Sequence, residues 1–257
     1  MPLLATVNGE PIEVATALRH SFFHGESFLA DAVASELIRQ YAEKTGISNT
    51  DAELQLAVDE VRYGRGLASA EAGRQWLRET HQTLLSLQHA VDLMLLYNKV
   101  RRAIPDAEVA AHYAEHKLEF EAADLYSIRV ESQAKASELH SQITDDSANF
   151  HALAMEHSTD VQSRHLGGYV GRLTRAKVTG EIEAAVFASR PPGVIGPIKT
   201  EHGWNLFKVT RIYRPTLAES ESRIRVELMD RLIAKLIKDA AITYPVLAQE
   251  EETAATA

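Results

Sequence analysis

The sequence has no cysteine among its 257 residues. This excludes disulfide bonds and thiol chemistry, but it does not decide the compartment, because many exported proteins also lack cysteine. The chain also lacks an excess of basic residues: 27 Lys and Arg stand against 36 Asp and Glu, which gives a formal net charge of −9. Binding to nucleic acid depends on accumulated positive charge, so we expect no nucleic-acid partner.

Long apolar runs are also missing. The most apolar helical stretch, residues 84–100, is interrupted by His89 and Asp92 well short of the ~20 residues that a membrane-spanning helix needs. Residues 1–7 show neither the basic start nor the long apolar core of a secretory signal. We therefore expect a cytoplasmic protein without a membrane segment, and 45% hydrophobic residues are enough for a core.

Helical patterns dominate the first part of the chain, after a short strand and turn over 4–12. Apolar spacing predicts helices over 14–23, 28–44, 50–63, 69–79, 84–103 and 107–116. Thr50 and Glu53 form a capping-box pattern, Ser69 is a second N-cap, and Gly46 is a C-terminal stop.

The end of the chain repeats the capping pattern with Thr216 and Glu219. It opens a helix over 217–241 with apolar residues along one stripe: Ile224, Leu228, Leu232, Leu236 and Ile237. Such a stripe must be buried against another element. The small, acidic tail 248–257 is expected to be disordered.

A different pattern occupies residues 157–209. Gly167, Gly168 and Gly171 bracket Tyr169 and Val170, which suits a tight turn into a short strand. A helix over 181–188 and a β-hairpin made of 194–199 and 204–209 follow.

The order of these motifs resembles the parvulin family of peptidyl-prolyl cis-trans isomerases. Three stretches carry the first part of the match: Phe150-His151-Ala152-Leu153-Ala154 with Ser158, Gly168-Tyr169-Val170-Gly171, and Glu183-Ala184-Ala185-Val186-Phe187. The family's closing signature is matched by Pro192-Gly193-Val194-Ile195-Gly196-Pro197-Ile198 with Thr200, Gly203, Trp204 and Val209. The similarity covers about residues 123–212.

The helical segments resemble the chaperone region of SurA- and PrsA-like proteins, through the V-N-G-E opening and Ile104-Pro105-Asp106-Ala107-Glu108. The resemblance implies an α+β fold in which a parvulin-like domain, a small antiparallel sheet with surrounding helices, is inserted into an all-α helical domain. The expected boundaries are 1–119 for the helical domain, 120–214 for the isomerase-like domain, and 215–247 for a C-terminal helix that packs back on the helical domain.

The resemblance also implies the site. The positions of the family's proline pocket are Val170, Leu173, Val178 and Ile182, smaller here than the usual Leu, Phe and Met. Asp160 falls where the family has Cys or Asp in its polar network, and Thr200 is retained. Two histidines usual in the family are replaced, by Ser127 in the first strand and by Asn205 in the last.

The sequence is therefore compatible with two functions of different class. One is a prolyl isomerase for a proline-containing polypeptide client, with catalytic candidates Asp160, Ser127, Asn205 and Thr200, activity reduced by the histidine losses, and no need for a metal or cofactor. The other is a non-catalytic peptide-binding chaperone that uses the same groove and the helical domain. A homo-oligomer through the helical domain is possible in either case.

Weaker patterns have plain structural alternatives. Arg172, Arg175 and Lys177 could select acidic residues before proline, or could simply be solvated. The i, i+4 pairs His112 and His116, and His20 and His24, lack the H-E-x-x-H order of a zinc protease and are expected to be solvated. The glycine turn lacks the order of a nucleotide loop. Ser158 and Ser163 lie beside histidines, but no nucleophile elbow accompanies them.

Overall fold

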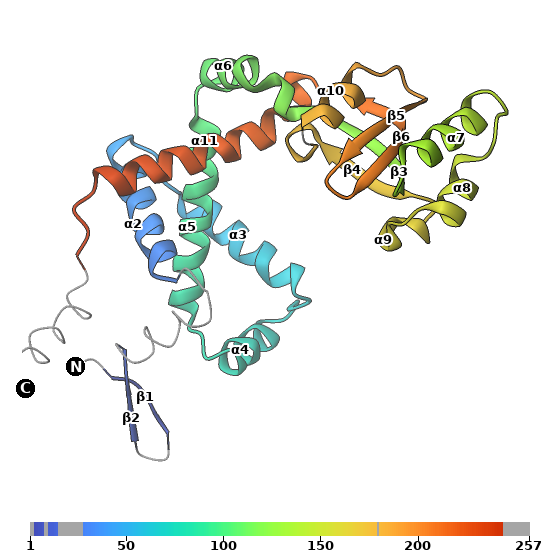
Figure 1. Cartoon of the computed structure of the whole chain (residues 1–257). Coiled ribbons are helices and arrows are strands. Elements are labelled where there is room, and N and C mark those ends of the chain that lie inside the picture. The colour runs from blue at the N-terminus through green and yellow to red at the C-terminus, as the bar shows by residue number, and fades with distance from the viewer. Residues whose placement is uncertain (1–2, 8–9, 15–27, 179, 244–257) are drawn as a thin grey trace, which may run out of the picture. The chain divides into compact units, whose positions relative to one another are not determined.

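A computed structural model describes residues 3–7, 10–14, 28–178 and 180–243 (Figure 1). The chain divides into two compact units, Met1–Pro105 with Arg225–Ala257, and Asp106–Ile224. The second unit is therefore inserted in the sequence of the first. The division falls at Pro105 and Ile224 rather than at the expected 119 and 214. Within the second unit, the Tyr113 hydroxyl donates to the Pro215 carbonyl at 2.7 Å. This bond joins the segments that precede and follow the sheet in the sequence.

The first unit is mainly helical. Its elements are β1 (Leu3–Val7), β2 (Glu10–Glu13), α2 (Phe28–Lys44), α3 (Asp51–Gly64), α4 (Ala70–Glu79) and α5 (Leu84–Ala103). The two strands pair antiparallel, which confirms the strand expected at the start, and residues 8–9 of the expected turn lie outside the described residues. The helix expected over 14–23, the pair His20 and His24, and the tail 248–257 lie outside the described residues.

The caps expected from the sequence set where the helices of this unit begin. The Thr50 hydroxyl accepts from the Glu53 amide at 3.3 Å, and the Glu53 carboxylate accepts from the Thr50 amide at 2.8 Å. Ser69 accepts from the Ala72 amide at 3.0 Å, at the start of α4. Gly46 follows α2 with φ 73°, a conformation that glycine adopts without steric cost. These caps are confirmed.

Helices α3 and α5 bury a small apolar core in this unit. Ala57, Val58 and Val91 are its buried members, and Leu87 and Leu95 pack against it from α5. The apolar repeat predicted along α5 is thus confirmed in its middle. Leu84, at the first turn of α5, is 55% exposed instead.

The second unit is built around a sheet. Its elements are α6 (Asp106–His116), η1 (Lys117–Phe120), β3 (Ala122–Val130), α7 (Gln133–Thr144), α8 (Phe150–His157), α9 (Val161–Arg164), β4 (Tyr169–Thr174), η2 (Arg175–Lys177), α10 (Gly180–Ala188), β5 (Gly193–Thr200), β6 (Gly203–Tyr213) and the start of α11 (Leu217–Asp239). The four strands are antiparallel in the order β4-β3-β6-β5. This confirms the α+β class and the small antiparallel sheet with surrounding helices.

The two faces of the sheet bury different clusters. On one face, Ile128, Val130 and Leu206 pack with residues of α7 and α8. On the other, Leu125 and Val209 pack with residues of α10. Because side chains alternate along a strand, Ser127 and Arg129 of β3 lie on the same face as Leu125. The α10 face is therefore the one on which polar residues and an apolar cluster meet.

Helix α11 begins in the second unit and continues into the first. Its capping box is confirmed, since the Thr216 amide donates to Glu219 at 2.7 Å and the Glu219 amide donates back to the Thr216 hydroxyl at 3.3 Å. The apolar stripe is only partly buried. Ile224 is fully buried, but Ile237, near the end of the helix, is 38% exposed. Within the described ranges, no helix is both long and apolar enough to cross a membrane.

Candidate functional site

The polar part of the candidate site is called the polar row. It begins with Arg129 and Asn205, which are neighbours across strands β3 and β6. Arg129 of β3 lies opposite Asn205 of β6, which lies opposite Ile198 of β5. In the next row, Ser127 lies opposite Phe207. Direct cross-strand partners lie on one face of a sheet, so these residues line the same surface. The sheet register therefore brings together Ser127 and Asn205, which are far apart in the sequence.

The segment after α8 is fastened to the end of β3 that β4 does not pair with. The Ser127 amide donates to the Gly168 carbonyl at 2.7 Å, and the Thr159 amide donates to the Arg129 carbonyl at 2.8 Å. The Arg129 amide donates to the Ser158 hydroxyl at 3.2 Å. These bonds hold the residues between α8 and β4 along the sheet edge.

The glycine turn makes this attachment possible. Gly168 has φ 84°, and a Cβ at this position would lie 2.5 Å from the Ser127 carbonyl oxygen. Any side chain would push the turn away from β3. The tight turn expected from the glycine pattern is confirmed, and its close approach to the strand explains why Gly168 has no side chain.

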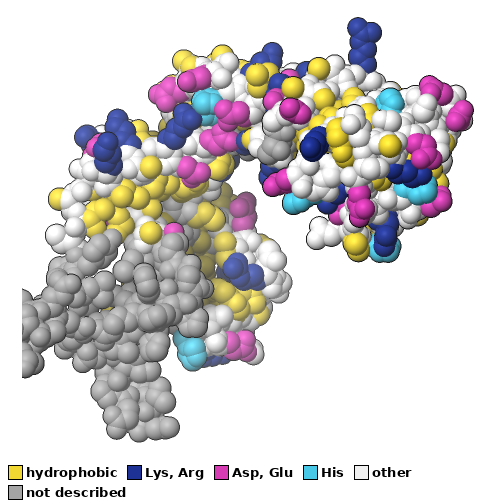
Figure 2. Space-filling view, viewed as in Figure 1, with side chains coloured by type: hydrophobic (Ala, Val, Ile, Leu, Met, Phe, Trp, Pro, Cys, Tyr) yellow, Lys and Arg dark blue, Asp and Glu magenta, His cyan; other side chains and the backbone are white. Residues whose placement is uncertain are grey.

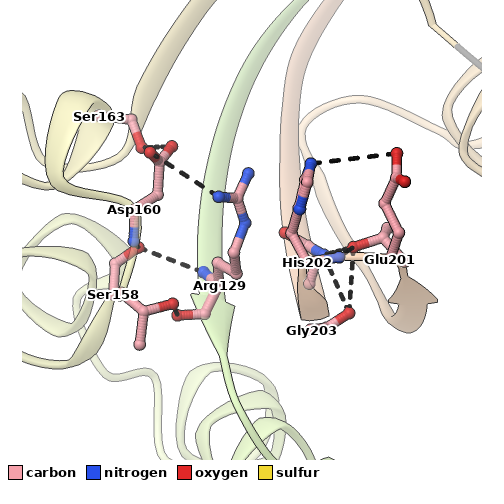
Figure 3. A network of polar contacts seen from close by, with 10 residues as sticks. Arg129, Ser158, Asp160, Ser163, Glu201, His202 and Gly203 are labelled. Carbon is pink, nitrogen blue, oxygen red and sulfur yellow. Dashed lines mark hydrogen bonds and ion pairs between the residues drawn. The ribbon is translucent and has the colours of Figure 1, made fainter.

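Asp160 lies at the polar row, beside Arg129 (Figure 3). Its Oδ2 accepts from the Ser163 hydroxyl at 2.6 Å, and its Oδ1 lies 4.0 Å from Arg129 Nη1. Asp160 is also the N-cap residue of the short helix α9. Its side chain is 22% exposed, so one side of the carboxylate faces solvent. The structure thus gives Asp160 both a helix-end position and a place in the polar network.

Asn205 and Thr200 form the other half of the row. The Asn205 side-chain amide donates to the Thr200 hydroxyl at 2.8 Å, and that hydroxyl donates to the Gly203 carbonyl at 3.1 Å. Asn205 is only 3% exposed, so its orientation is fixed by these bonds. A hydroxyl that donates to a carbonyl while accepting from an amide holds its neighbour in a single rotamer.

The positions of the proline pocket do not all behave alike. Leu173, Val178 and Ile182 pack into the cluster formed with Leu125 and Val209, and Val178 is only 7% exposed. Val170 stands apart from them in exposure, at 39%. Leu173 and Ile182, which are only partly buried, therefore form an apolar floor on the same face of the sheet as the polar row, and Val178 is part of the core beneath it.

The basic residues after the turn have partners within the fold. Arg172 makes two hydrogen bonds to Asp124, the shorter of 2.8 Å, and also bonds the Tyr213 hydroxyl. The bond from Arg172 outweighs partial burial and holds the pKa of Asp124 below its ordinary value. These contacts weaken the case that Arg172 selects an acidic residue of a client.

Arg175 is engaged in the same way. It bonds the buried Glu121 at 2.7 Å and also bonds Glu183 of α10. Arg172 and Lys177 are both exposed, but among the described residues Arg172 is paired with a carboxylate, Asp124, and no ion pair of Lys177 is seen.

Arg129 is a site residue that the sequence analysis did not single out. It occupies the centre of β3's polar end, between Asp160 and the strand that carries Asn205 (Figure 3). Its side chain is 30% exposed, and its Nε is buried without a hydrogen-bond partner among the described residues. The available clue was alternation: Arg129 is two residues from Ser127 and so shares its face.

Other sequence candidates have structural roles. Ser158 accepts from the Arg129 amide and Ser163 donates to Asp160, so both hydroxyls support the polar row. His112 is not solvated as expected but 5% exposed, with its ring centroid 4.5 Å from that of His116. In the part of the chain that the structure describes, no group of three or more potential metal ligands is found.

The fold and the order of motifs are those of a parvulin-type peptidyl-prolyl cis-trans isomerase with a helical chaperone-like region. A family model for rotamases, the PPIC-type PPIASE domain, matches residues 121–211. The activity that defines this class is the cis-trans isomerisation of peptide bonds before proline.

Several relatives align with most of the chain. It is similar to the foldase protein PrsA of Caldanaerobacter subterraneus subsp. tengcongensis, 25% identical over 217 residues, which span 84% of this chain and 67% of the relative. It is also similar to foldase protein PrsA of Geobacillus kaustophilus, 25% identical, over 85% of this chain and 77% of the relative. A crystal structure of the peptidylprolyl isomerase PrsA from Bacillus anthracis aligns with a TM-score of 0.46 at 19% identity, covering 85% of this chain and 99% of that one.

Proposed function

We propose that the protein is a folding helper that isomerises X-Pro bonds of unfolded polypeptide clients at the α10 face of its sheet. The observation that carries the proposal is that the polar row and the apolar floor of Leu173 and Ile182 lie on the same face of the sheet. A proline ring needs apolar contact, and the amide before it needs polar groups close by. The family match over residues 121–211 supports the same activity.

The energetics of the reaction suit such a surface. Rotation about a peptide bond has a barrier of ~18 to 20 kcal/mol because it breaks amide conjugation. No covalent bond has to be formed with the protein. A site that binds the twisted amide about 4 kcal/mol more tightly than the planar one accelerates rotation about a thousandfold. Hydrogen bonds and an apolar floor can supply that difference without a metal or cofactor.

We assign separate roles to the residues of the site. Leu173, Ile182 and the exposed Val170 contact the proline ring. Asp160 places a negative charge close to the rotating amide. Asn205 and Thr200 hold the wall of the polar row in one arrangement, and Ser127 anchors the glycine turn through its backbone.

The replacement of the usual histidines has a consequence for pH dependence. Neither a Ser127 hydroxyl nor an Asn205 amide titrates near neutral pH, whereas imidazole does. We therefore propose an isomerase of reduced activity whose kcat/KM shows no histidine titration between about pH 6 and 8. A bell-shaped profile in this range would contradict the proposed role of these two positions.

The test is an exchange assay on the full-length chain with short Ala-Pro peptides, followed by NMR or by coupled proteolysis. We expect acceleration by the wild type and a clear loss with Asp160→Ala. Because Asp160 bonds Ser163, thermal unfolding of the variant serves as the control for folding. Equal rates for both proteins, at equal stability, would remove Asp160 from the mechanism, and no acceleration by the wild type would remove isomerisation.

A second candidate function is client binding by the helical unit without catalysis. Hydrophobic side chains are exposed among the charged ones of this unit (Figure 2), including Leu56 at 66% and Leu85 at 75% exposure. A pocket of about 310 Å³ in this unit is lined by apolar residues such as Val58, Trp76 and Leu77 and by polar ones such as Arg62 and Gln88. Apolar surface of this kind is suited to unfolded segments.

Aggregation assays separate this function from the first. Leu85→Asp is expected to weaken the suppression of aggregation of a model client and to leave isomerisation of a short peptide unchanged. Leu118→Asp, at an exposed leucine of the other unit, is the matched control. If both variants protect the client as well as the wild type does, the helical surface is not the binding site.

The location and the assembly state stay predictions. We expect the protein in the cytoplasm, and cell fractionation would test this. Dimerisation through the helical domain would be detected by sedimentation across a range of concentrations.

A further inference from the structure

We propose that Arg129 is a catalytic residue of the isomerase site, and that its guanidinium donates a hydrogen bond to the prolyl nitrogen of the twisted amide. This inference rests on the proposed isomerase function and deepens it. The juxtaposition that carries it is an arginine in the polar row that lies opposite Asn205 in the sheet register and beside Asp160 (Figure 3).

The backbone of Arg129 is held by several bonds. Its amide donates to the Ser158 hydroxyl at 3.2 Å, and its carbonyl accepts from the Thr159 amide at 2.8 Å and from the Thr159 hydroxyl at 3.2 Å. The strand pair with Asn205 fixes the other edge. The backbone bonds fix the point at which the side chain leaves the strand, and the partly buried guanidinium lies beside Asp160.

The donors of this guanidinium are not used up by the fold. The distance of 4.0 Å between Nη1 and the Asp160 Oδ1 is too long for a hydrogen bond. Asp160 instead accepts from Ser163 at 2.6 Å. The Nε atom is buried and has no hydrogen-bond partner in the described part of the chain. Buried donors without a partner are rare in folded proteins, and one at the centre of a site indicates a group that a ligand completes.

Arg172 and Arg175 provide the contrast within the same unit. Both make short hydrogen bonds to carboxylates of the fold: Arg172 to Asp124 at 2.8 Å and Arg175 to Glu121 at 2.7 Å. These two arginines are therefore well paired. Arg129 is nearly as buried as Arg175, at 30% against 25% side-chain exposure, yet its contact with a carboxylate is the long one to Asp160.

The chemistry of rotation explains why a donor is useful here. When the amide twists, the nitrogen lone pair leaves conjugation with the carbonyl, so the nitrogen becomes a better acceptor and the carbonyl oxygen a poorer one. A donor directed at the nitrogen therefore binds the transition state more tightly than the planar ground state. Arginine keeps its proton at any physiological pH and offers five N–H groups. Arg129 thus restores a donor to a site in which Ser127 and Asn205 replace imidazoles.

The test measures kcat/KM of the full-length protein for an Ala-Pro and a Glu-Pro peptide, with Arg129→Met, Arg129→Lys and the exposed Arg190→Met as control. Loss of a charge-assisted hydrogen bond made in the transition state is expected to lower kcat/KM of Arg129→Met by about 10- to 100-fold on both peptides. Arg129→Lys keeps part of the activity, and Arg190→Met keeps all of it.

Chemical rescue separates contact with the substrate from a structural role. Millimolar guanidinium ion is expected to restore part of the activity of Arg129→Met and to leave the wild type unchanged. The melting temperature of Arg129→Met should not fall, because the substitution removes an unpartnered buried donor. A melting temperature lowered in parallel with activity, without rescue, would overturn the proposal.

Three further outcomes also decide the matter. A loss confined to the Glu-Pro peptide would overturn the proposal in favour of charge selection. If the wild type isomerises the peptides and Arg129→Met is equally active, this inference alone is overturned. If the wild type is inactive, the isomerase function on which the inference rests is overturned.

Discussion

Gly168→Ala is the substitution for which the structure makes the sharpest prediction about stability. A Cβ at this position would lie 2.5 Å from the Ser127 carbonyl oxygen and 3.0 Å from the Ala154 Cβ. Neither neighbour can move freely, because Ser127 belongs to the central strand β3 and Ala154 is fully buried in α8. The turn must therefore separate from the sheet, or the strand must distort.

The expected cost combines two effects. The residue has φ 84°, and a left-handed conformation costs an L-residue roughly 1–2 kcal/mol. Forcing extra volume into a packed site typically adds ~1–3 kcal/mol. We expect a total of about 3 kcal/mol, which corresponds to a fall of about 12 °C in melting temperature for a unit of about 120 residues.

Gly171→Ala is the matched control. Gly171 lies on β4, three residues after Gly168, and also has a positive φ, of 109°, but no atom of the described residues lies within 4 Å of its hypothetical Cβ. This variant has the conformational strain but not the collision, so we expect its free energy of unfolding to fall by only about 1–2 kcal/mol. The difference between the two variants measures the contact between the glycine turn and β3.

The two tryptophans allow the second unit to be followed by itself. Trp204 lies on β6 of the sheet and Trp76 on α4 of the helical unit. In a Trp76→Phe background, thermal unfolding monitored by fluorescence reports on the sheet. Equal melting temperatures for Gly168→Ala and Gly171→Ala would refute the reasoning, since the collision between the added methyl group and β3 would then have no energetic effect.

Three further predictions concern ion pairing and capping. Arg175→Met should destabilise the second unit by about 2–3 kcal/mol in denaturant titrations, because it leaves the buried Glu121 with weaker pairing; an unchanged midpoint would contradict this. Arg172 lowers the pKa of Asp124 from its ordinary 3.8, so the stability from this pair is present above that value and is lost as the pH falls through the lowered folded pKa. Asp124→Asn should therefore melt lower than the wild type at neutral pH and converge with it in strong acid, and a constant difference at every pH would refute the linkage. Thr83→Ala, which removes the N-cap of α5, should cost about 1 kcal/mol, and the restoring variant Thr83→Ser should recover most of it in thermal melts.

Local elements could be predicted because their causes are local. The start of α3 follows from the bonds between Thr50 and Glu53, which are three residues apart. The turn before β4 follows from glycines that alone adopt its conformations. Helix α7 shows the limit: its N-cap Ser132 bonds the Lys135 amide, but the sequence analysis did not single out this helix.

The partners of charged residues could not be predicted in the same way. Arg172 and Arg175 lie close together in sequence and both were candidates for binding a client, but their partners Asp124 and Glu121 come from the start of β3 and the residue before it. A charge is free or paired according to the register of β3 and β4, and that register is a property of the whole sheet. The same applies to Arg129, whose importance depends on its place opposite Asn205.

The amino-acid sequence alone predicted the helices, caps and turns, because these act over a few residues and can be read one segment at a time, and the order of its motifs resembles the parvulin family closely enough to predict the class. Only the tertiary structure decided what its site contains. The pairing of β3 with β6 and the attachment of residues 158–168 to the sheet edge set Arg129 between Asp160 and Asn205. Distances between such residues arise from packing and register across the whole unit, so short-range patterns carry no information about them.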